Sequence, residues 1–137
     1  MSLVLDSSVT LAWLYDDERS EAVERVFAAL AETVGWVPAI WRLEVANALQ
    51  QGVRRRRIDR DFRTQALEDL TNYEITTDTD TDTFAWTETL ALADRFGLTP
   101  YDACYLELAQ RLQLPLATLD GDLRAAGLAL GLELLGA

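Results

Sequence analysis

The feature that most constrains this chain is a helix, a turn and a buried strand that follow one another within residues 98–124. Thr99 is a suitable helix N-cap, and Pro100 suits the first helical position, where its missing N–H is not needed. Asp102 falls three residues after the cap, and apolar residues then recur at helical spacing up to Leu112. The sequence therefore predicts an amphipathic helix with a carboxylate in its first turn.

Pro115 ends this helix, and the four residues after it are Leu-Ala-Thr-Leu. Apolar runs of this kind are typical of strands buried in a parallel sheet, so we predict a strand over 116–119. Asp120 stands where the strand should end, and Gly121 opens the turn into the next helix. Because ligands of open α/β sheets bind beyond the carboxyl ends of the strands, Asp120 and Asp102 are candidate site residues.

Short apolar runs and amphipathic segments alternate along the rest of the chain. We predict further strands over 3–5, 35–37, 73–75 and 133–135. We predict further helices over 9–15, 16–31, 39–55, 59–70, 83–96 and 122–130. This order indicates a three-layer α/β/α sandwich, with helices on both faces of a central parallel sheet of four to five short strands. No repeat or linker divides the 137 residues, so we expect a single domain over 1–137.

The charged residues narrow the possible chemistry. All 12 basic residues are arginine, against 23 aspartate and glutamate residues, and the net charge is −11. The chain has no histidine, so a Ser-His-Asp or Cys-His system cannot be built in its usual form. The absence of lysine excludes a P-loop lysine and Schiff-base catalysis. Plentiful carboxylates suit magnesium and manganese, and without such ions or clustered arginines an acidic chain repels nucleic acid.

Cysteine usage and hydropathy bear on the compartment. Cys104 is the single cysteine, so it cannot form an internal disulfide, and its apolar neighbours favour a small buried side chain. No apolar run is long enough to span a membrane, and Asp6 follows the start too closely for a signal peptide. We therefore expect a cytoplasmic protein.

Asp6 directly follows the first apolar run, 3–5, which we expect to form the central strand. A carboxylate at this position is either a metal ligand or the N-cap of the next helix, since aspartate is common in both roles. The residues alone leave both interpretations open.

Glu44 interrupts an apolar row of the helix predicted for 39–55. Ile40, Glu44 and Ala48 share one face, so Glu44 stands where a buried apolar residue is expected. Burying an unpaired charge is costly. Glu44 therefore lies at the rim, pairs with an arginine or binds a cation, and Asn47 could hydrogen-bond to it.

Early apolar residues have two possible uses. Trp13 and Leu14 stand next to a helical stripe that includes Val23, Val26 and Phe27. These side chains could furnish a surface groove for a partner, or they could form part of the core, which is the simpler use.

Half of the basic residues fall within one short stretch, where they form a single cluster. Its members are Arg54, Arg55, Arg56, Arg57, Arg60 and Arg63. Cations favour helix C-termini, so the cluster could be a solvated helix end. Contact with an RNA backbone is the functional alternative.

Asp78, Asp80 and Asp82 alternate with threonine and suggest a calcium loop. The fit fails, because Thr83 and Thr89 occupy the positions where an EF-hand needs glycine and the bidentate glutamate. We expect a solvated loop that caps the following helix.

The carboxylates acquire meaning together. In the predicted architecture Asp6 and Asp120 end strands, while Glu44 and Asp102 lie near the starts of helices, so all four can face one end of the sheet. Carboxylates so near to one another repel, and this repulsion opposes folding unless cations neutralise their charge. Four acids without histidine or lysine therefore imply bound metal, and the chemistry that suits such a site is hydrolysis of a phosphodiester.

Three segments carry a family resemblance. The chain resembles the PIN-domain ribonucleases of the VapC type, the toxins of bacterial toxin–antitoxin pairs, in the segments LVLDSSVTLAWL, VPAIWRLEVANAL and LTPYDACYLELAQRLQLPLATLDGDLRAAG. The segments cover the start, middle and end of the chain in the usual order and spacing. The absence of lysine departs from the usual pattern and leaves contact with the substrate to arginines such as Arg54, Arg55, Arg56 and Arg57.

The resemblance implies a specific site and specific partners. It assigns the catalytic acids to Asp6, Glu44, Asp102 and Asp120, with Ser8 or Thr118 as supporting hydroxyls and Asp122 as an optional ligand. It implies Mg²⁺ or Mn²⁺ held by Asp6, Asp102 and Asp120, with Glu44 acting on the attacking water. It also implies an RNA substrate, a homodimer and a VapB-like antitoxin.

Other classes of function compete with this hypothesis. A PIN fold kept as a non-catalytic protein-binding scaffold is the main alternative, although the intact acids count against it. A phosphatase of the haloacid dehalogenase type needs a second aspartate where Ser8 stands, and it also needs a lysine. A receiver domain phosphorylated on aspartate lacks its lysine here as well.

Overall fold

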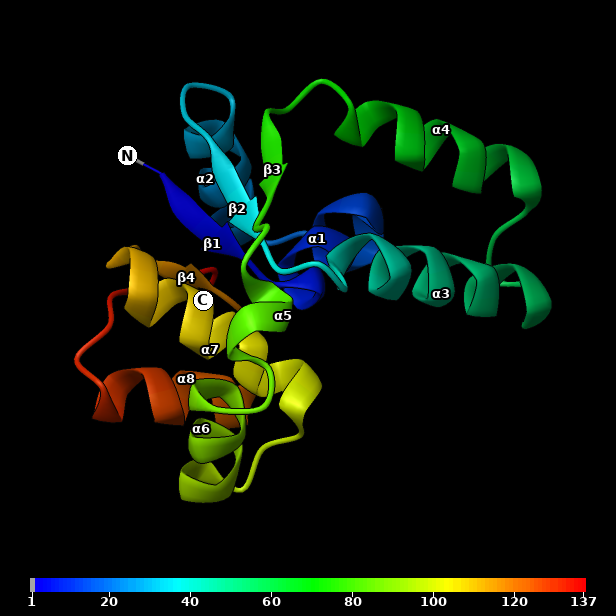
Figure 1. Cartoon of the computed structure of the whole chain (residues 1–137). Helices are drawn as coiled ribbons and strands as arrows, with labels where there is room; N and C mark the ends of the chain where they lie inside the picture. The colour runs from blue at the N-terminus through cyan, green and yellow to red at the C-terminus, as the bar shows by residue number, and fades with distance from the viewer. Residues whose placement is uncertain (1) are drawn as a thin grey trace.

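A single sheet organises the computed structural model, which describes residues 2–137 (Figure 1). Its five strands all run parallel, in the order β3-β2-β1-β4-β5. The strands are β1 (Leu3–Leu5), β2 (Gly35–Val37), β3 (Ile75–Thr77), β4 (Leu116–Ala117) and β5 (Leu134–Leu135). β1 lies at the centre, as the sequence predicts.

Helices fill the connections between the strands. They are α1 (Ser7–Leu14), the short 3₁₀ helix η1 (Asp16–Glu18), α2 (Glu21–Leu30), α3 (Trp41–Arg54), α4 (Arg60–Leu70), α5 (Thr81–Phe84), α6 (Glu88–Phe96), α7 (Pro100–Leu112) and α8 (Gly121–Ala129). Within residues 2–137, no helix is both long enough and apolar enough to cross a lipid bilayer.

The direction in which the chain crosses the sheet decides which face each helix covers. From β1 the chain steps outward to β2 and β3, and it then returns to β4 and β5 on the other side. Crossovers between parallel strands are right-handed, so α1 to α4 cover one face and α7 and α8 the other. Packing agrees, since α1 contacts α2 and α3 whereas α7 contacts β1, β4 and α8 (Figure 1). The predicted three-layer sandwich is confirmed.

This reversal marks a switch point at one end of the sheet, and we call the region outside it the crevice. In open α/β sheets the crevice lies outside the carboxyl ends of the two strands between which the direction changes. Those strands are β1 and β4 here. Asp6 comes directly after β1, and Asp120 opens α8 shortly after β4. The fold therefore brings the two acids to the same end of the sheet.

Burial explains why the central segments form strands and helices. Leu3, Val4 and Leu5 of β1 are at most 1% exposed, because helices cover both faces of the sheet. The middle of α7 is also buried, from Ala103 to Ala109. Cys104 lies within this buried segment as a free thiol, as expected.

The early apolar residues belong to the core. The ring of Trp13 stacks on Phe27 with centroids 4.3 Å apart, and Tyr73 meets Phe27 edge-on. Val23 and Val26 are buried beneath them. The core interpretation is therefore confirmed for Val23, Val26 and Phe27, whereas Trp13 is only half-buried and also lines a small cavity.

The single helix predicted for 16–31 is wrong. The chain forms η1 and then becomes extended at Arg19 and Ser20 before α2 begins. The Ser20 hydroxyl accepts a hydrogen bond from Val23 N at 3.2 Å and so starts a new helix. Arg19 meanwhile turns back and donates to the carbonyl of Trp13.

The helix predicted for 83–96 is also two elements, α5 and α6. Thr87 separates them with φ −119° and ψ −96°, which is not a helical conformation. α5 begins earlier than predicted because Thr81 is buried and bonded: it accepts from Ala39 N at 3.0 Å and donates to Asp78 at 3.0 Å.

The strand predicted for 73–75 lies two residues further on, at β3. Pairing with β2 sets this register, since Ile75 stands opposite Gly35 and Thr77 opposite Val37. Tyr73 is instead drawn into the aromatic cluster around Trp13. The other predicted elements are present, with ends within two residues of those expected.

Candidate active site

Asp6 lies at the junction of β1 and α1, at the carboxyl end of the central strand. It is only 4% exposed. Although it occupies the N-cap position of α1, its side chain makes no capping hydrogen bond. Its Oδ2 instead accepts from Ser8 Oγ at 2.6 Å and from Thr118 Oγ1 at 2.8 Å. Asp6 is therefore the N-cap residue of α1 by position, but it does not cap the helix through its side chain.

Ser8 and Thr118 tie the two sides of the crevice together. Thr118 Oγ1 also accepts from Asp120 N at 3.0 Å, and Ser8 Oγ accepts from Leu119 N at 2.9 Å. The loop after β4 is thus held against the start of α1. Both hydroxyls touch Asp6, so each of the predicted supporting residues lies where it can orient that carboxylate.

Asp102 and Asp120 stand at the starts of the two helices that border the crevice. Asp102 lies in the first turn of α7, and its backbone N–H donates to the capping Thr99 Oγ1 at 3.1 Å, as predicted. Asp120 caps α8, because its Oδ1 accepts from Leu123 N at 2.9 Å. Both carboxylates are half-buried, whereas Asp122 is exposed.

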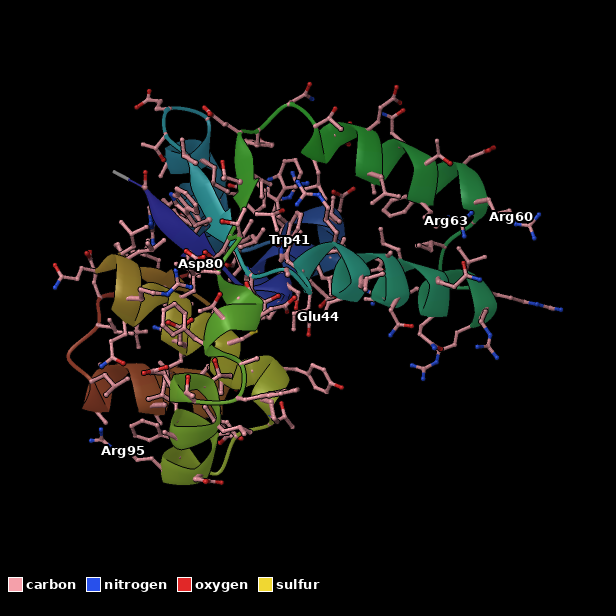
Figure 2. All side chains as sticks on the ribbon, in the orientation of Figure 1. Trp41, Glu44, Arg60, Arg63, Asp80 and Arg95 are labelled. Carbon is pink, nitrogen blue, oxygen red and sulfur yellow. The ribbon has the colours of Figure 1, made fainter. Side chains whose placement is uncertain are left out.

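Glu44 enters the site from α3, on the opposite layer (Figure 2). The hydroxyl of the fully buried Tyr105 of α7 donates a hydrogen bond to Glu44 Oε1. Glu44 is half-buried, and its partner is a phenol rather than the arginine or Asn47 considered from the sequence. Tyr105 escaped sequence analysis, although its position three residues after Asp102 puts both on one helical face.

The charges of these acids act on one another. Burial raises the pKa of Asp6, and the negative charges of Asp102 and Asp120 raise it further against the hydrogen bonds from Ser8 and Thr118. Burial and then the charge of Asp120 raise the pKa of Asp102. These shifts mean that Asp6, Asp102 and Asp120 share one electrostatic environment.

The same environment reaches Glu44. Burial raises the pKa of Glu44, the hydrogen bond from Tyr105 opposes that rise, and the charges of Asp6 and Asp102 add to it. Within residues 2–137, no ion pair joins any of the four acids to an arginine. The four carboxylates therefore share one region of unbalanced negative charge.

This donor set suits a hard cation. Carboxylate and hydroxyl oxygens are the ligands that Mg²⁺ and Mn²⁺ take, and a cation would relieve the repulsion that raises these pKa values. No three acidic side chains of the described chain stand close enough to form a ready-made metal cluster. A cation would have to draw them together, and the half-buried Asp102 and Glu44 leave room for that rotation.

A second acidic cluster, away from these residues, contains a base. The predicted solvated loop is wrong for Asp78, which is only 5% exposed, whereas Asp80 and Asp82 are exposed. Arg111 Nη2 donates to Asp78 Oδ2 at 2.7 Å, and its Nε donates to Glu107 Oε2 at 2.8 Å. Burial alone would raise the pKa of Asp78, but Arg111 lowers it below the ordinary value.

The arginine cluster lies far from the acids. Arg60 and Arg63 stand at the end of the α3–α4 hairpin opposite to Glu44 (Figure 2). Arg54, Arg55 and Arg56 are exposed. Arg57 is engaged within the chain, since it pairs with Asp17 at 3.1 Å and with Glu18 at 2.7 Å and lies over the ring of Tyr15.

Comparison with known proteins identifies the class to which this fold and site belong. The model of the PIN domain family matches residues 3–128, and the chain therefore belongs to the PIN-domain family. Within it, the chain is similar to Ribonuclease VapC3 of Pyrobaculum aerophilum. The two are 33% identical over 123 residues, which cover 90% of this chain and 92% of that relative. The resemblance noted from the sequence is confirmed.

Solved structures agree on the fold. PAE2754 from Pyrobaculum aerophilum superposes with a TM-score of 0.63 at 27% identity, covering 92% of this chain and 87% of that one. VapBC2 from Rickettsia felis, solved bound to a promoter DNA fragment, gives a TM-score of 0.65 at 17% identity and covers 98% and 97% of the two chains.

Proposed function

We propose that this protein is a metal-dependent endoribonuclease that hydrolyses RNA phosphodiester bonds and acts as the toxin of a toxin–antitoxin pair. One observation carries the proposal: four carboxylates gather at the crevice beside β1 and β4 with no base to balance them. Membership of the PIN-domain family and the likeness to Ribonuclease VapC3 support the choice of RNA as substrate.

Asp6, Asp102 and Asp120 are the proposed metal ligands, with Asp122 as an optional one at the exposed edge. A divalent cation bound there would neutralise charge, lower the pKa of water and stabilise the leaving oxygen. Asp6 is the best fixed of the three, because Ser8 and Thr118 hold one of its oxygens. Ser8 and Thr118 are therefore proposed as positioning residues, whose hydroxyls orient the Asp6 carboxylate.

Glu44 is the proposed proton acceptor for the attacking water. Its raised pKa makes it a better base than an ordinary glutamate, and Tyr105 holds one of its oxygens. The water would lose a proton to Glu44 as its oxygen attacks phosphorus in line. The bond from phosphorus to the 3′ oxygen breaks and that oxygen takes a proton from solvent water, which leaves a 3′ hydroxyl and a 5′ phosphate.

The partners follow from the same relatives. We propose a VapB-like antitoxin, because proteins of this fold have been solved as VapBC2 of Rickettsia felis and as a toxin–antitoxin complex from Klebsiella pneumoniae. A homodimer is proposed as the form in solution, to be measured by light scattering. Arg54, Arg55 and Arg56 remain the proposed contacts to the RNA backbone away from the acids.

RNA cleavage with controlled metal content tests the proposal. The purified protein should cut a mixed RNA pool in Mg²⁺ or Mn²⁺, and excess chelator should stop it. Asp6→Asn should lower the rate more than about 100-fold, since even residues that only support metal ligands cost 10- to 100-fold. Circular dichroism should show an unchanged fold in the variant. Absence of metal-dependent cleavage by the wild type would overturn the proposal.

A non-catalytic scaffold is the second candidate. The lack of a ready-made cluster of three acids among residues 2–137 favours it. Titration calorimetry separates the two candidates: the nuclease requires Mn²⁺ binding that Asp6→Asn weakens, whereas a scaffold requires none.

A further inference from the structure

Arg124 lies in the first turn of α8, one turn after Asp120, and its half-buried side chain reaches the ends of two strands. Its Nη1 donates to the carbonyl of Thr118 at 2.7 Å and to the carbonyl of Leu135 at 3.1 Å. Within residues 2–137 it makes no ion pair, although the chain contains 23 acids. The guanidinium therefore serves two backbone oxygens rather than a carboxylate.

The Thr118 carbonyl depends on this donor because the sheet ends beside it. Thr118 N donates to Leu135 O at 3.1 Å, just beyond the paired residues of β4 and β5. A parallel ladder would continue with Ala137 N donating to Thr118 O. Gly136 leaves the extended conformation, with φ +102°, and the described backbone does not form that bond. Thr118 is fully buried, so without Arg124 its carbonyl would lack a partner.

Thr118 connects this contact to the candidate site. Its Oγ1 donates to Asp6 Oδ2 at 2.8 Å and accepts from Asp120 N at 3.0 Å. One hydroxyl thus holds two of the proposed metal ligands, the first by its carboxylate and the second by its backbone. The place of that hydroxyl is set by the backbone of Thr118, and Arg124 bonds the carbonyl of this backbone.

We propose that Arg124 is a positioning residue of the candidate site: it holds the turn from Thr118 to Asp120 and so keeps Asp6 and Asp120 arranged for a divalent cation. The inference rests on the proposed function and adds a residue that acts only through Thr118. Charge alone predicts the opposite effect, because a guanidinium one turn from Asp120 repels a cation and its removal would strengthen cation binding. Weaker binding after removal of Arg124 is therefore the mark of positioning.

Titration calorimetry of the whole chain with Mn²⁺ tests the inference. Arg124→Met keeps an unbranched side chain without donors, and it should weaken Mn²⁺ binding about tenfold, as groups that support metal ligands do. Arg124→Lys keeps the charge but has one nitrogen in place of the guanidinium fork, so it should weaken binding only about threefold. Arg25→Met is the matched control. Arg25 is exposed and makes no ion pair in the described chain, so the loss of its screened charge should change the affinity less than about twofold.

Amide hydrogen exchange without metal observes the turn itself and separates this inference from the proposed function. Leu119 N donates to Ser8 Oγ and Asp120 N to Thr118 Oγ1, so both amides should exchange slowly in the wild type. In Arg124→Met both should exchange at least about tenfold faster, while the amide of the buried Leu106 in α7 stays slow. If the wild type neither cuts RNA nor binds Mn²⁺, the proposed function fails, and the two amides still decide whether Arg124 holds the turn.

Three results would overturn the inference. They are Mn²⁺ binding that is unchanged or tighter in Arg124→Met, a loss of affinity in Arg25→Met as large as that in Arg124→Met, and unchanged exchange of Leu119 and Asp120. If Arg124→Met does not fold, Arg124→Lys takes its place in both measurements. Wild-type affinity and wild-type exchange in Arg124→Lys would then overturn the inference in the same way.

Discussion

Two groups of carboxylates in this protein differ in whether they contact a base. Asp78 and Glu107 share Arg111, which donates to both of them. Asp6 and the acids around it share only hydroxyl and amide donors. Burial acts to raise the pKa of both Asp6 and Asp78, but hydrogen bonds from Arg111, Asp80 N and Thr81 lower the pKa of Asp78 below its ordinary value. Burial thus does not by itself decide how a carboxylate behaves.

The difference distinguishes acids that stabilise the fold from acids that form a candidate site. Arg111 pairs with both Asp78 and Glu107 and joins α7 to the segment after β3, so each of these buried acids has a basic partner. The crevice acids lack such a partner, and folding alone gains nothing from keeping them together. The chain keeps these acids together although their repulsion is not compensated. Such repulsion is a physical sign of a functional site whose charge a ligand neutralises.

Removing Arg111 from its cluster with Asp78 and Glu107 should have the largest effect on stability. Arg111→Met leaves Asp78 and Glu107 buried without their base, and removal of one partner of a buried pair costs about 3 to 5 kcal/mol. Urea unfolding in chelator should show this loss. Arg95→Met is the matched control, since Arg95 is exposed and lies over Phe96 without an ion pair in the described chain; it should cost less than about 1 kcal/mol. Equal stability of the two variants would remove the structural role of Arg111.

Removing one of the crevice acids should have the opposite effect on stability. Without metal at pH 7, Asp6→Asn should stabilise the protein by about 1 kcal/mol, because it removes repulsion while an amide oxygen can still accept from Ser8 and Thr118. A destabilised variant in chelator would contradict the repulsion.

The pH dependence follows from the directions of these shifts. The folded pKa of Asp6 lies above its unfolded value, so its unfavourable contribution is full above the folded pKa and disappears as pH falls through it. The gain from Asp6→Asn should therefore shrink on acidification towards the ordinary aspartate range. The folded pKa of Asp78 is lowered, so its contribution is present above the unfolded pKa and is lost as pH falls through the folded one. Thermal unfolding followed from pH 7 to below the ordinary aspartate pKa of about 3.9 measures both.

The smallest effect concerns Tyr105. Its hydrogen bond lowers the pKa of Glu44, so Tyr105→Phe should raise that pKa further and move the acid limb of the rate profile to higher pH. The rate at pH 7 should fall about threefold, the size of one modest hydrogen bond. Tyr73→Phe, in the aromatic cluster around Trp13, should leave the profile in place. A profile unchanged in Tyr105→Phe would exclude Glu44 as the base.

Sequence patterns predicted what depends on local chemistry. The Thr99 cap, the buried run at β1 and the acids at strand and helix ends all follow from residues within a few positions of one another. Long-range contacts could not be read in this way. Arg111 pairs with Asp78, which is 33 positions away in the sequence, so Asp78 is buried in an ion pair and not solvated as its loop suggested. Pairing with β2 shifts β3 by two residues, and a contact across 61 positions brings Tyr105 to Glu44.

Helix α7 carries both kinds of charge along its length. Asp102 and Tyr105 stand in its first half, and Arg111 anchors its last turn to Asp78. A helix fixed at one end cannot easily slide along its axis, so the arrival of an ion should act on side-chain torsions rather than on the backbone. Rotation of the half-buried Asp102 and Glu44 is a side-chain motion, which is faster than a rearrangement of packed helices. Loading of the crevice would then be set by how fast ions diffuse in, and not by any slow rearrangement of the scaffold.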